Sequence, residues 1–168
     1  MSRALLLTPR LSLHPWRVDD AEEAWRIWGD PEVMRFVGPP HPDPARTRRA
    51  LRAAIEAELT HGVCLWRVEE RHTGRTVGAC GFHAIAPPQG PALELAYHFR
   101  RSAWGQGYAT EAARACVQLA FERLDAPRIL AWTHPDNQAS QRVLLKLGFQ
   151  PSAPEGDELV FVLWPPLA

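Results

Sequence analysis

The stretch Glu94–Leu124, ELAYHFRRSAWGQGYATEAARACVQLAFERL, predicts a strand, a glycine turn and a long helix in direct succession. From Leu93 to Phe99 bulky apolar side chains alternate with smaller or polar ones, which is the period of a β-strand. Trp104–Ala109 contains two glycines and predicts the turn. After it, apolar side chains recur at helical spacing as far as Leu124, so one face of a helix is apolar.

The turn has the chemistry of an anion site. Glycines let backbone N–H groups approach a ligand closely, and the following helix adds unpaired N–H groups and the positive end of its dipole. Phosphate or pyrophosphate is the natural ligand. A P-loop would need Gly-Lys-Ser/Thr, and a dinucleotide fingerprint would need a third glycine where Thr110 stands. The alternative interpretation is a turn that needs glycine for its backbone alone.

Several ordered motifs resemble the GNAT superfamily of acyl-CoA-dependent N-acetyltransferases. The phosphate loop of that family, Arg/Gln-x-x-Gly-x-Gly/Ala, is matched at Gly107 and Ala109, with Trp104 in the first place. This tryptophan and the run WGQGYATEA look like the RimJ/RimL branch, which acetylates protein N-termini. The resemblance covers nearly the whole chain and includes Thr8–Leu13, Asp30–Phe36, Thr73–Gly78, Asn137–Ser140 and Lys146–Phe149.

The order of elements predicts an α/β (α+β) fold. Strands are expected at Leu5–Leu13, Val63–Glu69, Val77–His83, Glu94–Phe99, Arg128–Thr133, Phe149–Gln150 and Glu158–Trp164, and helices at Asp20–Trp28, Pro44–Thr60, Ala109–Leu124 and Gln138–Leu147. Val33–Val37 is expected to be a short turn or helical piece. The resemblance implies a mixed, mostly antiparallel sheet of about seven strands with a splayed parallel pair, flanked by about four helices.

Composition limits the class of protein. A chain of 168 residues suits a single domain, here 1–168. The formal net charge is zero, so no basic excess indicates a nucleic-acid partner. The three cysteines are widely spaced in apolar stretches, and we expect them to be buried rather than bridged or metal-bound. With no signal peptide or long apolar run, the sequence predicts a soluble cytoplasmic protein without a membrane partner.

The resemblance implies that acetyl-CoA is the co-substrate and that no metal is needed. The cofactor would lie across the splayed ends of the strands Glu94–Phe99 and Arg128–Thr133. The pantetheine would pair with backbone near Phe99 to Arg101, and the pyrophosphate with N–H groups of the turn. The cofactor-binding residues expected on this basis are Phe99, Arg100, Arg101, Gly105, Gln106, Gly107, Tyr108, Ala109, Thr110, Asn137 and Ser140. Solvated arginines and an ordinary helix N-cap are the alternatives for Arg100, Arg101 and Asn137.

Acetyl transfer to an amine needs a proton acceptor and a donor for the departing thiolate. Glu94 is the first candidate for the base, since a carboxylate in a central strand is costly unless paired or functional, and a salt-bridged glutamate is the alternative. His98 and His83 are secondary candidates. The resemblance implies that Ser140 protonates the thiolate, because Leu144 occupies the place where many GNAT enzymes carry a tyrosine acid.

The leading hypothesis is an N-acetyltransferase whose acceptor is a protein N-terminal α-amine or a small-molecule amine. A non-catalytic acyl-CoA-binding or regulatory module of the same fold is the second hypothesis. A nucleotide-binding protein, the third, is disfavoured because the turn lacks Gly-Lys-Ser/Thr. We expect the acceptor pocket to be formed by Trp25–Val37, Pro39–Pro44 and the loop before Pro91. The sequence leaves the acceptor and the oligomeric state open, and a homodimer is one possibility.

Overall fold

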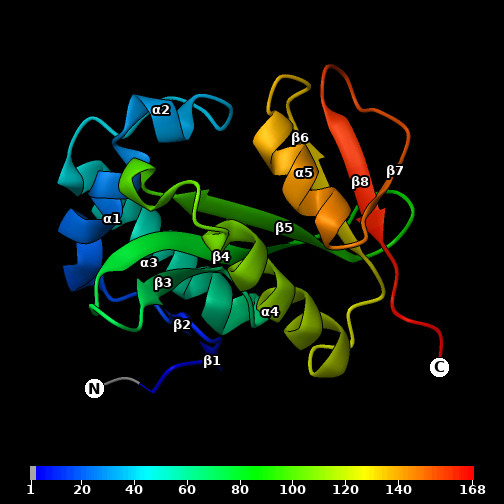
Figure 1. Ribbon diagram of the computed structural model, residues 1–168, viewed down its shortest axis with the longest axis horizontal. Coiled ribbons are helices and arrows are strands. Elements are labelled where there is room, and N and C mark those ends of the chain that lie inside the picture. The colour runs from blue at the N-terminus through cyan, green and yellow to red at the C-terminus, as the bar shows by residue number, and fades with distance from the viewer. Residues whose placement is uncertain (1–2) are drawn as a thin grey trace.

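The computed structural model describes residues 3–168 and contains one eight-stranded mixed sheet in the order β1-β2-β3-β4-β5-β6-β8-β7 (Figure 1). The strands are β1 Leu6–Leu7, β2 Leu11–His14, β3 Leu65–Glu70, β4 Thr76–Ile85, β5 Ala92–Phe99, β6 Ile129–Thr133, β7 Gln150–Pro151 and β8 Leu159–Leu163. All neighbouring strands are antiparallel except β5 and β6, which are parallel. The expected fold class is therefore confirmed.

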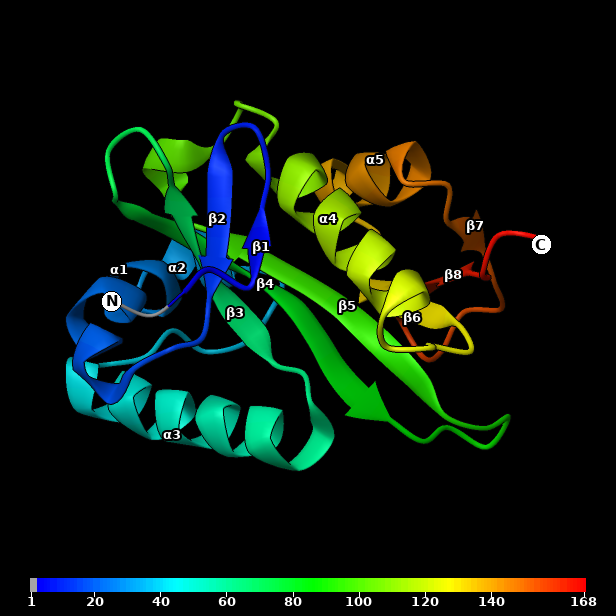
Figure 2. The same cartoon turned by 90° about the horizontal axis from the view of Figure 1, so that it is seen from below.

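Helices cover both faces of the sheet (Figure 2). They are α1 Ala21–Trp28, α2 Pro31–Met34, α3 Pro44–His61, α4 Tyr108–Glu122 and α5 Gln138–Lys146, with short 3-10 turns at Val18–Asp20 and Arg101–Ala103. Helices α1 and α3 pack together on one face, whereas α4 packs on the other against β4 and β5. Two apolar cores result, one on each face. Across residues 3–168, no helix has both the length and the apolar character of a membrane span.

Two expected boundaries differ from the structure. The predicted strand Leu5–Leu13 is a hairpin of β1 and β2, because the N–H of Thr8 bonds the Leu11 carbonyl at 2.9 Å and closes a turn around Pro9. This hairpin raises the number of strands to eight. A fifth helix, α2, forms near the expected short piece because the Asp30 carboxylate caps it and proline occupies its first position.

The alternation predicted for β5 is confirmed. Its register with β4 runs without a break from Ile85↔Ala92 to Gly78↔Phe99, so successive side chains take opposite faces. The core beneath α4 receives Leu93, Leu95, Tyr97 and Phe99. Ala96 faces the core beneath α1 and α3, and Glu94 and His98 share that face by the same alternation.

The parallel pair separates soon after it begins. Strands β5 and β6 are paired only at Leu93↔Ile129 and Glu94↔Leu130. Beyond these residues β5 stays with β4, and β6 stays with β8. A V-shaped opening therefore forms in the middle of the sheet, and α5 and the start of α4 lie beside it (Figure 1).

Candidate active site

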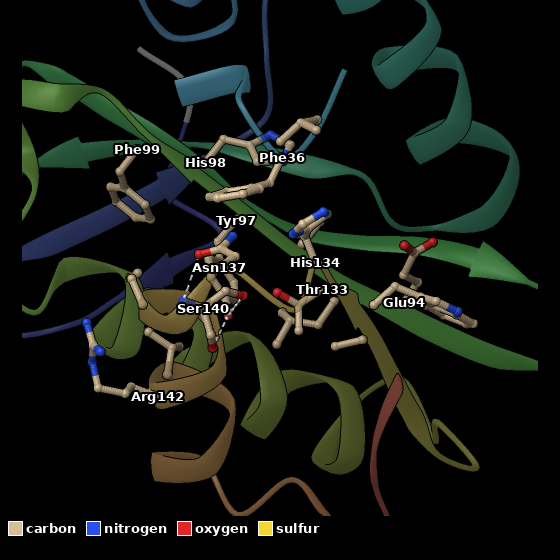
Figure 3. Close-up of a pocket in the computed structure, with 18 of the residues that line it drawn as sticks. Phe36, Glu94, Tyr97, His98, Phe99, Thr133, His134, Asn137, Ser140 and Arg142 are labelled. Carbon is tan, nitrogen blue, oxygen red and sulfur yellow. Dashed lines mark hydrogen bonds between the residues drawn. The ribbon is translucent and has the colours of Figure 1, made fainter. Parts of the chain in front are cut away.

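A cavity of about 1100 Å³ opens between the diverging ends of β5 and β6. It is bordered by the segment around α2, the start of α4 and α5. The predicted site residues that line it are Glu94, Phe99, Gly105, Gly107, Tyr108, Ala109, Thr110, Asn137 and Ser140. Residues far apart in the sequence thus meet at one place, and Figure 3 shows Glu94, Phe99, Asn137 and Ser140 around it.

Backbone groups of β5 form one wall of the opening. Alternate residues of β5 bond to β4, and the residues between them turn their backbone groups toward the other edge. The N–H of Leu93 points that way, since it bonds the Arg128 carbonyl at 3.3 Å. By the same alternation, the N–H and carbonyl of Tyr97 and the N–H of Phe99 face the opening. The Phe99 carbonyl accepts the indole N–H of Trp104 at 2.7 Å.

The predicted glycine turn has the geometry of an anion site. Gly105 and Gly107 have φ angles of 75° and 77°, in the left-handed region that favours glycine. Gly107 is the N-cap of α4, and among residues 3–168 no side chain caps this helix start. The first N–H groups of α4, on Tyr108, Ala109 and Thr110, are therefore available at the positive end of the helix dipole.

Arg10 supports the turn from behind, a contact that sequence reasoning missed. Its guanidinium donates to the Gln106 carbonyl at 2.8 Å and to the Glu111 carboxylate at 2.7 Å. It also lies 4.6 Å from the centre of the Tyr108 ring. Burial alone would raise the pKa of Glu111, but hydrogen bonds from Thr8 and Arg10 hold that pKa below its ordinary value. The motif Thr8–Leu13 was noted only as part of the family resemblance and indicated neither the hairpin nor its contact with α4.

The two arginines expected near phosphate are engaged elsewhere. Arg100 donates to the Thr76 carbonyl at 3.1 Å, and Arg101 forms an ion pair with Asp30 at 3.0 Å. Positive side chains reach the cavity instead from α5, where Arg142 and Lys146 are among the lining residues. Their four-residue spacing places both on one face of the helix, which is the signal that sequence analysis left unused.

Asn137, Ser140 and Tyr97 form a hydrogen-bonded group at the edge of the cavity next to α5. The Asn137 side-chain oxygen accepts the Ser140 N–H at 3.2 Å, so it caps α5. The Tyr97 hydroxyl lies 2.9 Å from Ser140 Oγ and 3.1 Å from the Ser140 carbonyl oxygen (Figure 3). Burial raises the pKa of Tyr97 above its ordinary value. In the sequence, Tyr97 has the pattern of an apolar strand position, so its place in this group was not predicted. Leu144 is buried in the core and does not line the cavity.

Titratable groups line the opposite face of β5. Burial raises the pKa of the Glu94 carboxyl, with a further contribution from Glu158 and an opposing one from His83. His98 accepts the indole N–H of Trp28 on Nδ1 at 3.0 Å, so the nitrogen with a lone pair is already bonded. Burial lowers the pKa of His98 to about 4. His98 is therefore a neutral hydrogen-bond donor through Nε2 rather than a base.

An aromatic pair borders the same side. The rings of Phe36 and His134 stack with centres 5.1 Å apart, which joins the segment after α2 to the end of β6 (Figure 3). Of the stretches expected to form the acceptor pocket, Trp25–Val37 contributes only Glu32, Val33, Arg35, Phe36 and Val37 to the cavity lining, and the loop before Pro91 contributes Pro87 and Pro88. The stretch Pro39–Pro44 does not line the cavity. Glu158, just before β8, is a further lining carboxylate that sequence analysis did not single out.

Comparison with known proteins gives a family match over most of the chain. The family model described as "Acetyltransferase (GNAT) domain" matches residues 10–150. The uncharacterized N-acetyltransferase p20 of Bacillus licheniformis is 31% identical over 146 residues, 86% of this chain and 82% of that protein. The protein YkkB of Bacillus subtilis is 33% identical over 150 residues, 88% of this chain and 86% of its own length.

Solved structures show the same fold. RimL, the ribosomal L7/L12 α-N-protein acetyltransferase in complex with coenzyme A, matches with a TM-score of 0.84 at 17% identity. The match covers 97% of this chain and 98% of that chain.

Proposed function

Because the chain belongs to the GNAT acetyltransferase family and is an N-acetyltransferase, we propose that it transfers an acetyl group from acetyl-CoA to a primary amine by direct attack in a ternary complex. One observation carries this proposal. A single cavity is bounded by unpaired backbone and a glycine turn on one side and by a carboxylate of raised pKa on the other. It has room for both substrates in contact.

The residues of the cofactor side fit acetyl-CoA. The backbone groups of Tyr97 and Phe99 along the edge of β5 pair with the amides of the pantetheine arm. The pyrophosphate takes the N–H groups from Gly107 to Thr110, where the helix dipole favours negative charge. Arg142 adds a positive charge at the edge of the cavity. The side chains of Arg100 and Arg101 contribute indirectly, by holding the segment before the turn.

The chemistry is assigned to two side chains. Glu94 accepts the proton of the attacking amine, directly or through water. Its raised pKa is closer to the pKa of an amine than that of an ordinary carboxyl, which favours the proton transfer. Ser140 lies at the start of α5 beside the cavity and presents its hydroxyl to the departing sulfur. No covalent enzyme intermediate is needed. Cys116, which is fully buried, takes no part.

The acceptor is proposed as a protein N-terminal α-amine or a small-molecule amine. The α-amino acceptor stated in the name of RimL, which shares this fold, supports the first class. An α-amine also titrates nearer neutrality than a lysine amine, so it asks less of a base. Assays of the CoA thiol released from acetyl-CoA distinguish these classes. The acceptors to compare are peptides with free and blocked N-termini, polyamines and amino sugars.

Calorimetric titration with acetyl-CoA tests the proposed site. We expect the native protein to bind and Gly107→Glu to lose binding, because the new side chain places a carboxylate at the pyrophosphate position and strains a φ of 77°. Gly74→Glu is the matched control, since Gly74 lies in the β3–β4 hairpin with a φ of 71°. Equal binding by all three proteins would refute the placement of the pyrophosphate. The absence of binding to any acyl-CoA would refute the proposed function.

A further inference from the structure

Tyr97 and Ser140 connect the two sides of the splayed opening. Tyr97 belongs to β5 and Ser140 to the first turn of α5, which follows β6. The phenol lies 2.9 Å from Ser140 Oγ and 3.1 Å from the Ser140 carbonyl oxygen, and both residues line the cavity. Figure 3 shows this group beside Asn137, which fixes the Ser140 backbone. The serine proposed to face the sulfur is thus held by a tyrosine from the strand.

Counting protons shows that this contact has two arrangements. A carbonyl oxygen only accepts, whereas each hydroxyl has one proton to donate. When Tyr97 donates to the Ser140 carbonyl, Ser140 has to donate to the phenol oxygen to complete the 2.9 Å contact. Its proton is then unavailable to a ligand. When Tyr97 donates to Ser140 Oγ, the serine proton is free to point into the cavity. A small rotation of two hydroxyl groups interconverts the arrangements.

We propose that Tyr97 is a positioning residue for the transfer. It frees the Ser140 hydroxyl to donate a hydrogen bond to sulfur as negative charge develops there. This inference rests on the proposed function. As the amine nitrogen bonds to the carbonyl carbon, the carbon–sulfur bond breaks and its electron pair goes to sulfur. Tyr97 then donates to Ser140 Oγ, and Ser140 donates a hydrogen bond to the thiolate. Glu94 receives the amine proton, and the thiolate takes its proton from solvent.

Tyr97 keeps its proton throughout this step. Burial raises the pKa of its phenol above the ordinary value near 10, whereas a thiol titrates near 8.5. Full transfer of the phenol proton toward sulfur would therefore run uphill. The role of Tyr97 is to orient and polarise a hydrogen bond, which acts on a charge that is present only as the bond breaks. Its loss should accordingly lower kcat more than it changes KM.

A double-mutant cycle tests this role. Tyr97→Phe should lower kcat about five- to tenfold, the worth of one hydrogen bond, and leave KM for acetyl-CoA within about twofold. Ser140→Ala should lower kcat by at least as much. If Tyr97 acts through Ser140, adding Tyr97→Phe to Ser140→Ala should change kcat by less than about twofold. Ser152→Ala removes an exposed hydroxyl between β7 and β8 and is the matched control.

Two outcomes of the cycle would overturn the inference. Independent, multiplying effects of the two substitutions would mean that Tyr97 does not act through Ser140. An unchanged kcat in Tyr97→Phe would mean that it does not act in the transfer. Thermal unfolding of each variant separates these outcomes from loss of folded protein, because kcat is then expressed per folded molecule.

Binding of free CoA gives a second measurement that needs no turnover. A hydrogen bond from Ser140 favours the thiolate, so native protein should bind CoA more tightly at pH 9.5 than at pH 6.5, relative to acetyl-CoA, which has no thiol. Tyr97→Phe should reduce that preference about fivefold, again the worth of one hydrogen bond. An unchanged preference would refute the inference while leaving the proposed function intact. If the native protein binds CoA but no amine releases thiol, the proposed function fails by itself.

Discussion

Lowering the pH from 7 to 5 should cost the folded protein about 2 kcal/mol through His98 alone. His98 lies on β5 and faces Trp28 of α1, whose indole N–H bonds its Nδ1 at 3.0 Å. The ring cannot take a proton at Nδ1 without losing that bond. Burial, followed by the charge of nearby His83, lowers the pKa of His98 from 6.5 to about 4. The folded protein thus opposes protonation of this ring.

The sign of the effect follows from proton counts. Between pH 6.5 and pH 4 the unfolded chain binds a proton at His98 and the folded chain does not, so stability falls as the pH falls. The whole shift corresponds to about 3 kcal/mol, because one pKa unit is worth about 1.4 kcal/mol. About 2 kcal/mol of this is lost by pH 5, and the remainder is lost by about pH 4.

Urea unfolding of native protein and His98→Gln, followed by tryptophan fluorescence at pH 7 and pH 5, measures the effect. Glutamine keeps an oxygen that accepts the Trp28 indole N–H and has no charge to titrate. The carboxylates and the other histidines contribute equally to both proteins. The variant should therefore lose about 2 kcal/mol less than the native protein over this interval. Equal losses would refute the reasoning that His98 is held neutral.

Three further predictions concern the turn, the base and the sheet. Arg10→Met removes the guanidinium that holds the glycine turn and should weaken acetyl-CoA binding about tenfold in calorimetry; unchanged affinity would contradict that supporting role. Glu94→Gln should lower kcat at least about a hundredfold. It should also abolish the fall in kcat that native protein shows as the pH drops through the raised pKa of Glu94. If the variant keeps this fall in kcat at low pH, the base is another residue. Gly81→Ala places a Cβ 2.0 Å from the Cys64 carbonyl oxygen and should destabilise the protein by about 3 kcal/mol or more in urea, whereas Gly38→Ala, with nothing within 4 Å, should not.

Local sequence patterns predicted most of the helices and strands, whereas the splayed sheet was expected from the family resemblance. The two-residue period of β5 and the helical period after Gly107 both appear in the structure as expected. Which side of each element is apolar depends on side chains only a few residues apart, so the sequence alone is sufficient to predict both elements. The hairpin at Thr8 was missed although Thr8, Pro9 and Arg10 interrupt the leucines, because its turn is closed by hydrogen bonds between the Thr8 hydroxyl and the Leu11 backbone, which strand periodicity does not reveal.

The sequence predicted the backbone geometry of the candidate site but not the contacts between distant side chains that line it. The turn needs residues with positive φ angles, and the sequence shows glycine, the residue that adopts them most easily, at positions 105 and 107. The contact of Tyr97 with Ser140 joins residues 43 positions apart, and that of Arg10 with Glu111 joins residues 101 apart. In the sequence, Tyr97 has the pattern of a core residue and Arg10 that of a solvated one. Only the packing of α4 and α5 on the sheet gives them partners.

In the proposed function, strand β5 places the reaction within the sheet rather than on its surface. Paired strands lie about 4.8 Å apart, which leaves no room for an acyl arm between them, so the separation after Glu94↔Leu130 is a requirement for binding in the plane of the sheet. Because successive side chains of β5 point to opposite faces of the sheet, the strand presents different residues to each side of the opening. Tyr97 points toward α5, where we propose the cofactor binds, and Glu94 lies on the opposite face, from which the amine is proposed to approach. In the proposed reaction the amine adds to the carbonyl carbon from the Glu94 side, and Ser140, which Tyr97 contacts, lies near the departing sulfur, so both substrates react in direct contact.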